Sequence, residues 1–191
     1  MLVRIKSTDM KTTTPTPQKV TIDYHDSALF DLFVTELKDV YWAEKYIVKN
    51  LPKMAKAATS EDLKELLNAH LDETQNQVER LEEIFQLIDK RAVGKRCDGM
   101  DGLIEESRTI IDKTEDGTLT RDVGLIASAQ KIEHYEIATY GTLKTIAAVL
   151  DLDDQIIDLL TETLEEEKEV DQKLTQLAES HINEDAREEE N

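Results

Sequence analysis

Apolar residues recur every three or four positions along four long stretches of the chain. This spacing places them on one face of an α-helix, so each stretch predicts a long amphipathic helix. Glycine and proline are scarce, which lets such helices run without interruption. The four predicted helices cover residues 27–57, 59–93, 121–150 and 153–182.

The connections between the predicted helices are unequal in length. Tight turns join the first helix to the second and the third to the fourth. A long segment separates the second and third helices, and it contains a shorter helical pattern from Met100 to about Thr114. Two antiparallel hairpins joined by one long crossover form the topology of ferritin-like bundles. The predicted fold class is therefore all-α, a ferritin-like four-helix bundle with a short extra helix in the crossover.

The two ends of the chain differ from the predicted bundle. Residues 1–26 include a stretch of threonines and two prolines, which favours a flexible N-terminal tail. Residues 183–191 are rich in glutamate and are expected to form an acidic C-terminal tail. Residues 27–182 are the predicted bundle domain.

Each row of core-facing residues is apolar at both ends and ionisable in its middle. The middle positions lie at similar distances from the turns of the two hairpins, so antiparallel packing would bring them to one level of the bundle. These candidate metal ligands are Glu44, His70, Glu73, Glu133, Glu136, Glu167 and Asp171.

Six buried carboxylates and one imidazole at one level need compensating positive charge. No basic residue lies on the core-facing rows to supply this charge. The nearest ones, Arg80 and Lys168, only flank the rows. Two divalent cations would supply the charge, and oxygen-rich ligands suit iron or manganese better than a closed zinc site. Gln77 and Tyr140 lie on the same rows and are interpreted as core or supporting residues.

Net charge and cysteine content limit the classes of partner and the cellular compartment that we expect. A net charge of −19 disfavours binding to nucleic acid, because phosphates would be repelled. One cysteine, Cys97, rules out a disulfide within the chain and fits a reducing compartment. No secretory signal or run long enough to span a bilayer is evident. We therefore expect a soluble cytoplasmic protein that binds neither nucleic acid nor membrane.

Several segments resemble the YciE/YciF family of bacterial ferritin-like proteins, which are linked to stress responses. The matching segments are DVYWAEK at 39–45, HLDET at 70–74, CDGMDGLIEE at 97–106, EHYEIA at 133–138 and TLEEEK at 163–168. The resemblance implies a ferritin-like bundle, a di-metal centre and a homodimer, without an established activity. The ligand pattern departs from ferritin-like oxidases and rubrerythrins, because the second helix reads His70-x-x-Glu73 and the fourth offers Glu167 with Asp171 and no histidine beside them.

The leading hypothesis is a protein that binds two iron ions and handles iron, oxygen or peroxide under stress. Manganese and zinc are alternative metals. Two other interpretations stay open at this point: a metal-free helical interaction or structural protein, and a passive metal buffer without turnover. Whether the protein is an enzyme is left undecided, and no catalytic residue is assigned.

Overall fold

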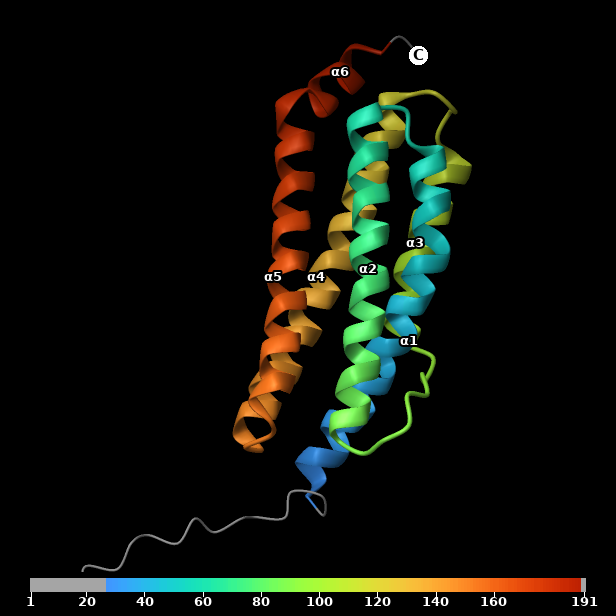
Figure 1. Cartoon of the computed structure of the whole chain (residues 1–191). Coiled ribbons are helices and arrows are strands. Elements are labelled where there is room, and N and C mark those ends of the chain that lie inside the picture. The colour runs from blue at the N-terminus through green and yellow to red at the C-terminus, as the bar shows by residue number, and fades with distance from the viewer. Residues whose placement is uncertain (1–26, 190–191) are drawn as a thin grey trace, which may run out of the picture.

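The computed structural model describes residues 27–189, and within them the fold is all-α. Four long helices run antiparallel along one axis, with a shorter helix beside them (Figure 1). The predicted ferritin-like bundle is confirmed. The predicted N-terminal tail, residues 1–26, lies outside the described residues. The helices are α1 (Ala28–Ala57), α2 (Glu61–Leu87), α3 (Asp98–Lys113), α4 (Leu119–Val149) and α5 (Asp154–Leu177).

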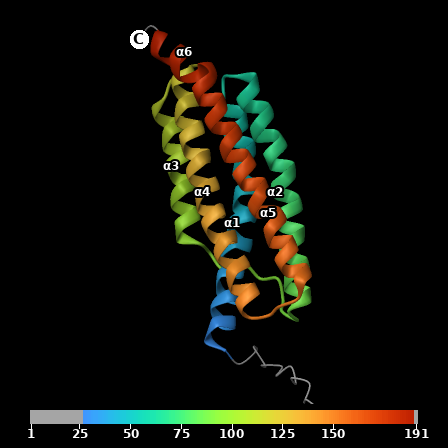
Figure 2. The ribbon, with the colours of Figure 1, turned by 90° about the vertical axis from the view of Figure 1, so that its left-hand side faces the viewer.

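The hairpins and the crossover follow the predicted topology. Helices α1 and α2 form one hairpin and α4 and α5 the other, and contacts between α1 and α4 and between α2 and α5 close the bundle. Helix α3 is the predicted crossover helix, and it packs against the outside of α1 and α4 (Figure 2). Gly124 permits this close approach, because a Cβ there would lie 2.4 Å from Cγ2 of Ile110 on α3.

Local capping sets the start of most helices. Ser27 Oγ accepts a hydrogen bond from the Phe30 amide at 3.1 Å, and Thr118 Oγ1 accepts one from the Arg121 amide at 3.3 Å. Helix α2 is capped from elsewhere in the chain. The buried Asp122 carboxylate of α4 accepts bonds from the amides of Thr59 and Ser60, each at 2.7 Å. Asp122 thus ties the α1–α2 turn to the second hairpin.

Replacing Asp122 by alanine is expected to lower the free energy of unfolding by about 1–3 kcal/mol, because two amides lose their acceptor. Urea denaturation followed by circular dichroism measures the change. Asp112→Ala, at an exposed position of α3, is the control and should shift the midpoint little. Equal stability of the Asp122→Ala and Asp112→Ala variants would show that the turn amides do not depend on this carboxylate.

The apolar interior is divided into two cores along the bundle. One lies toward the α1–α2 turn and the other toward the α4–α5 turn. The first includes Leu51, Leu63, Leu125 and Leu174, and the second includes Phe33, Phe85, Leu143 and Leu160. The ionisable residues predicted from the sequence fall between them.

The C-terminal residues continue past α5 against the start of α4. A π-helical turn (Ala178–Ile182) leads into the short helix α6 (Asn183–Glu188), so residues assigned from the sequence to an acidic tail are helical in the structure. The Glu189 carboxylate accepts hydrogen bonds from the amides of Leu119 at 2.5 Å and Thr120 at 3.0 Å. Negative charge is favourable at this helix N-terminus.

Within residues 27–189, no helix combines the length and the apolar character that a membrane span requires.

Candidate metal centre

Five of the seven predicted ligand residues are buried between the two apolar cores. They come from all four long helices, and none exposes more than 2% of its surface. The antiparallel hairpins bring these residues to one height along the bundle, as their spacing from the turns predicts. We call these five residues the acidic layer: Glu44, His70, Glu133, Glu136 and Glu167.

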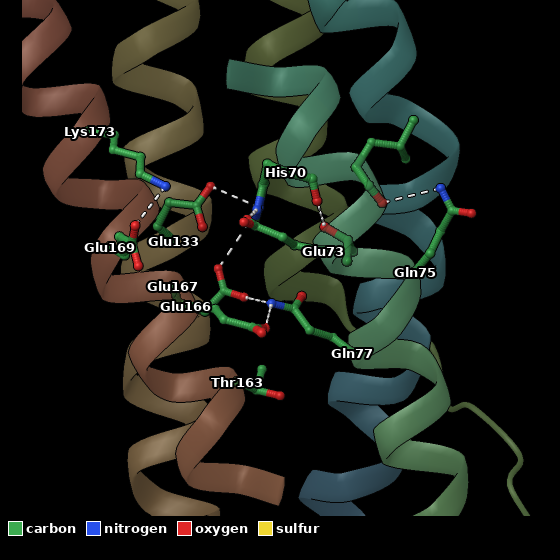
Figure 3. Close-up of polar contacts among 12 residues, drawn as sticks. His70, Glu73, Gln75, Gln77, Glu133, Thr163, Glu166, Glu167, Glu169 and Lys173 are labelled. Carbon is green, nitrogen blue, oxygen red and sulfur yellow. Dashed lines mark hydrogen bonds and ion pairs between the residues drawn. The ribbon is translucent and has the colours of Figure 1, made fainter. Parts of the chain in front are cut away.

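Four members of the acidic layer form a tight quartet. One ligand atom from each of His70, Glu133, Glu136 and Glu167 lies within 4.8 Å of the others. His70 Nε2 is 3.4 Å from Glu133 Oε1 and 3.9 Å from Glu167 Oε2 (Figure 3). Donors gathered this closely can share a metal ion after small side-chain adjustments.

Glu44 belongs to the acidic layer but not to the quartet. Its Oε1 accepts a hydrogen bond from the Tyr140 hydroxyl, and its Oε2 has no hydrogen-bond partner. Glu44 and Glu136 lie close enough to affect each other's protonation. Glu44 therefore lies beside the quartet and interacts with both Glu136 and Glu167.

The structure places Glu73 and Asp171 at the margins of the acidic layer. Glu73 is partly exposed, and its Oε2 lies 3.5 Å from His70 Nδ1. Asp171 is also partly exposed, and its carboxylate contacts His134 Nε2 at 3.2 Å and Gln130 Nε2 at 3.3 Å. Neither carboxylate is in the quartet. Their role as metal ligands stays a prediction, and it would require rotation of the side chains.

A hydrogen-bond network surrounds the layer at α2 and α5. Gln77 Nε2 donates to Glu167 and also to Glu166 Oε2, the latter at 3.1 Å. Arg80 in turn pairs with Glu166 at 2.6 Å and Glu162 at 2.7 Å. A supporting place for Gln77 and a flanking one for Arg80 were predictable from the sequence. The part of Glu166 in this network was not predicted, although Glu166 is the chain neighbour of Glu167 and contacts Gln77 and Arg80 of α2.

Unpaired buried atoms are concentrated in this layer. Among the described residues, nine buried side-chain nitrogen or oxygen atoms lack a hydrogen-bond partner, and eight belong to the acidic layer and Gln77. They include both His70 nitrogens and both Glu136 oxygens. Each such atom costs about 1–3 kcal/mol when left unsatisfied. Bound cations would give these atoms partners, so the donor set fits a metal site.

Burial and mutual repulsion shift the protonation of the layer. Burial raises the pKa of Glu44 to about 8, with a further contribution from the Glu167 charge. Burial and the neighbouring carboxylates also raise the pKa values of Glu133 and Glu136 well above the usual range. The adjacent His70 imidazole instead lowers the pKa of Glu73. Without cations, Glu44, Glu133 and Glu136 therefore retain protons near neutral pH.

The donor chemistry selects among metals. Four buried carboxylates and one imidazole form an oxygen-rich site without a thiolate, since Cys97 lies in the core toward the α1–α2 turn. Structural zinc sites prefer cysteine and histidine, whereas carboxylate-rich sites suit iron and manganese. Iron and manganese therefore match this donor set better than zinc does.

Comparison with known proteins confirms the resemblance seen in the sequence. Residues 28–187 match the family described as Domain of unknown function (DUF892). Protein YciF of Escherichia coli (strain K12) is 45% identical over 157 residues, which are 82% of this chain and 93% of YciF.

Solved structures agree with these sequence matches. The crystal structure of the E. coli stress protein YciF has a TM-score of 0.78 and 44% identity, covering 82% of this chain and 98% of YciF. YcfI from Rhodopseudomonas palustris, described as a structural protein, has a TM-score of 0.75 and 41% identity, covering 81% of this chain and 97% of YcfI. The chain therefore belongs to the DUF892 family and is similar to the E. coli stress protein YciF.

Proposed function

We propose that the acidic layer binds two divalent metal ions, with iron preferred, and that the protein handles iron, oxygen or peroxide under stress. The observation that carries this proposal is the concentration of unpaired buried donor atoms at one level of the bundle. A core that served packing alone would place apolar or fully paired side chains there.

Charge balance supports two ions rather than one. Glu44, Glu133, Glu136 and Glu167 carry four negative charges when ionised, and two divalent ions bring four positive charges. With a neutral His70, the occupied layer would have no net charge, which lowers the penalty of burial. Glu44 interacts with Glu136 and Glu167 of the quartet, so these carboxylates, together with Glu133 and His70, would hold the ions.

The residues around the layer would orient its ligands. The Tyr140 hydroxyl donates to Glu44 Oε1, and Gln77 donates to Glu167 Oε1, which leaves one oxygen of each carboxylate without a partner. The apolar cores on both sides exclude bulk water. Iron, when bound, would supply electrons for reduction of dioxygen or peroxide.

Metal content tests this proposal. Protein purified without added metal, and the same protein titrated anaerobically with Fe²⁺, is analysed for bound elements. Two ions per chain are expected, with anomalous scattering located at the acidic layer. A protein that stays fully folded after exhaustive chelation, and then takes up no added metal, would instead support a structural role. The description of YcfI favours that alternative.

Redox behaviour separates a reactive centre from a passive metal buffer. After anaerobic loading with Fe²⁺, added peroxide is expected to oxidise the bound iron, and a rise in near-ultraviolet absorption from ferric iron measures this change. Stoichiometric binding without any such change would identify a metal buffer.

A further inference from the structure

We propose that a groove between α2 and α5 is the route by which cations reach the acidic layer. This inference rests on the proposed function and adds a direction of access to it. The walls of the groove include Asp62, Glu65 and Glu73 of α2 and Lys173 of α5, and the volume of the groove is about 310 Å³. His70 forms part of the same wall.

The His70 imidazole connects the groove with the interior. Its Nδ1 lies 3.5 Å from Glu73 Oε2 on the groove side, and its Nε2 lies 3.4 Å from Glu133 Oε1 on the layer side. The ring is only 2% exposed, and neither nitrogen has a hydrogen-bond partner. A buried imidazole with two unpaired nitrogens, between a surface groove and a carboxylate quartet, is suited to pass a cation inward.

Two other surface cavities of the described residues do not reach the layer in this way. The cavity between α3 and α4 is lined by residues between Gly102 and Lys131, and the cavity beside Trp42 by residues of α1 and the 88–97 segment. Neither lining contains a member of the acidic layer. The two apolar cores close the bundle above and below it.

The charges of the groove favour cations. Asp62 and Glu65 are exposed, and neither forms an ion pair with any residue in the 27–189 range. Lys173 is the opposing charge, and its ammonium lies 2.8 Å from Glu169 Oε1 (Figure 3). Three carboxylates facing one already paired ammonium produce a negative potential, which raises the local cation concentration and the rate of association.

Glu73 is placed to receive a cation at the mouth of the layer. Its side chain is 36% exposed, whereas that of His70 behind it is 2% exposed. A carboxylate that is half in water can replace part of a cation's hydration shell before the imidazole does. Glu73 and His70 thus form two successive ligands on the path to Glu133 and Glu167.

The rate of metal loading tests the route. Metal-free full-length protein is mixed with Co²⁺ at low salt, uptake is followed by visible absorption in stopped flow, and the final metal content is measured. Asp62→Asn combined with Glu65→Gln is expected to slow loading by about fivefold or more, with the final content unchanged. High salt should reduce the difference, because screening weakens steering.

Two further variants sharpen the test. Lys173→Gln removes the opposing charge and should accelerate loading. Glu105→Gln combined with Glu106→Gln removes two carboxylates from the α3–α4 cavity and should load at the rate of the unaltered protein.

The outcomes distinguish this route from the proposed function. Loading of the unaltered protein at a rate that neither the Asp62/Glu65 nor the Lys173 substitutions change would overturn the route and leave metal binding intact. Failure of the unaltered protein to take up Co²⁺ or Fe²⁺ at all would overturn the proposed function, and the route with it.

Discussion

Replacing Glu136 by leucine is expected to stabilise the metal-free protein and to abolish stoichiometric metal binding. Both Glu136 oxygens are buried without a hydrogen-bond partner, so the glutamate destabilises the fold when no cation is present. Leucine has a similar volume and no polar atoms. The free energy of unfolding should rise by about 1–3 kcal/mol, the usual cost of an unsatisfied buried polar group.

Urea denaturation in the presence of a chelator measures the stability, and elemental analysis after Fe²⁺ loading measures the binding. Glu79→Leu, at an exposed position of α2, is the matched control and should keep both ions with little change in stability. Glu136 would be a structural residue rather than a ligand if the Glu136→Leu variant were less stable than the unaltered protein yet still bound two ions.

The metal-free protein is expected to lose stability as the pH rises from about 5 to about 8. Burial raises the pKa of Glu44 from its usual 4.5 to about 8, and it raises those of Glu133 and Glu136 in the same direction. In this range the folded state keeps protons that the unfolded state has released. Each such carboxyl therefore removes stability at about 1.4 kcal/mol per pH unit.

Bound cations should reverse this trend, because they take the place of the protons and bind better as the carboxyls ionise. Denaturation midpoints at several pH values, with chelator and with Mn²⁺ or anaerobic Fe²⁺, check both halves of the prediction. The Glu136→Leu variant should show a shallower slope with chelator. A metal-free stability that is flat or rises with pH would contradict the assignment of protonated carboxyls to the layer.

The periodicity of the sequence was sufficient to predict the bundle, because each long helix buries one continuous face. Helix α1, for example, runs from Ala28 to Ala57, as the spacing predicted. The cap at Asp122 could not be predicted in the same way. Its partners, Thr59 and Ser60, come from the other hairpin, and only the packed fold brings them together.

The acidic layer was predicted in its centre and less well at its margins. Residues four apart on a helix are rotated by roughly 40°, and residues three apart by roughly 60° in the other sense. Asp171 contacts His134 instead of the quartet, and Glu73 stays beside His70 at the partly exposed edge of the layer. The periodic pattern of core-facing positions places all four residues on the inner face of their helices. That face is wider than the small volume in which the ligands of one metal site must lie. The two irons, the oxidant and the homodimer stay predictions.

Division of the interior into two apolar cores has a consequence for how the acidic layer is kept together. Like charges or crowded carboxyls at one level would drive the four helices apart if that level were the end of the bundle. Here the hydrophobic packing on either side holds the four helices together, so folding itself brings the donor atoms to one level. Under the proposed function, an ion that binds there would meet donors that are already in position, and the protein would rearrange little when it binds or leaves.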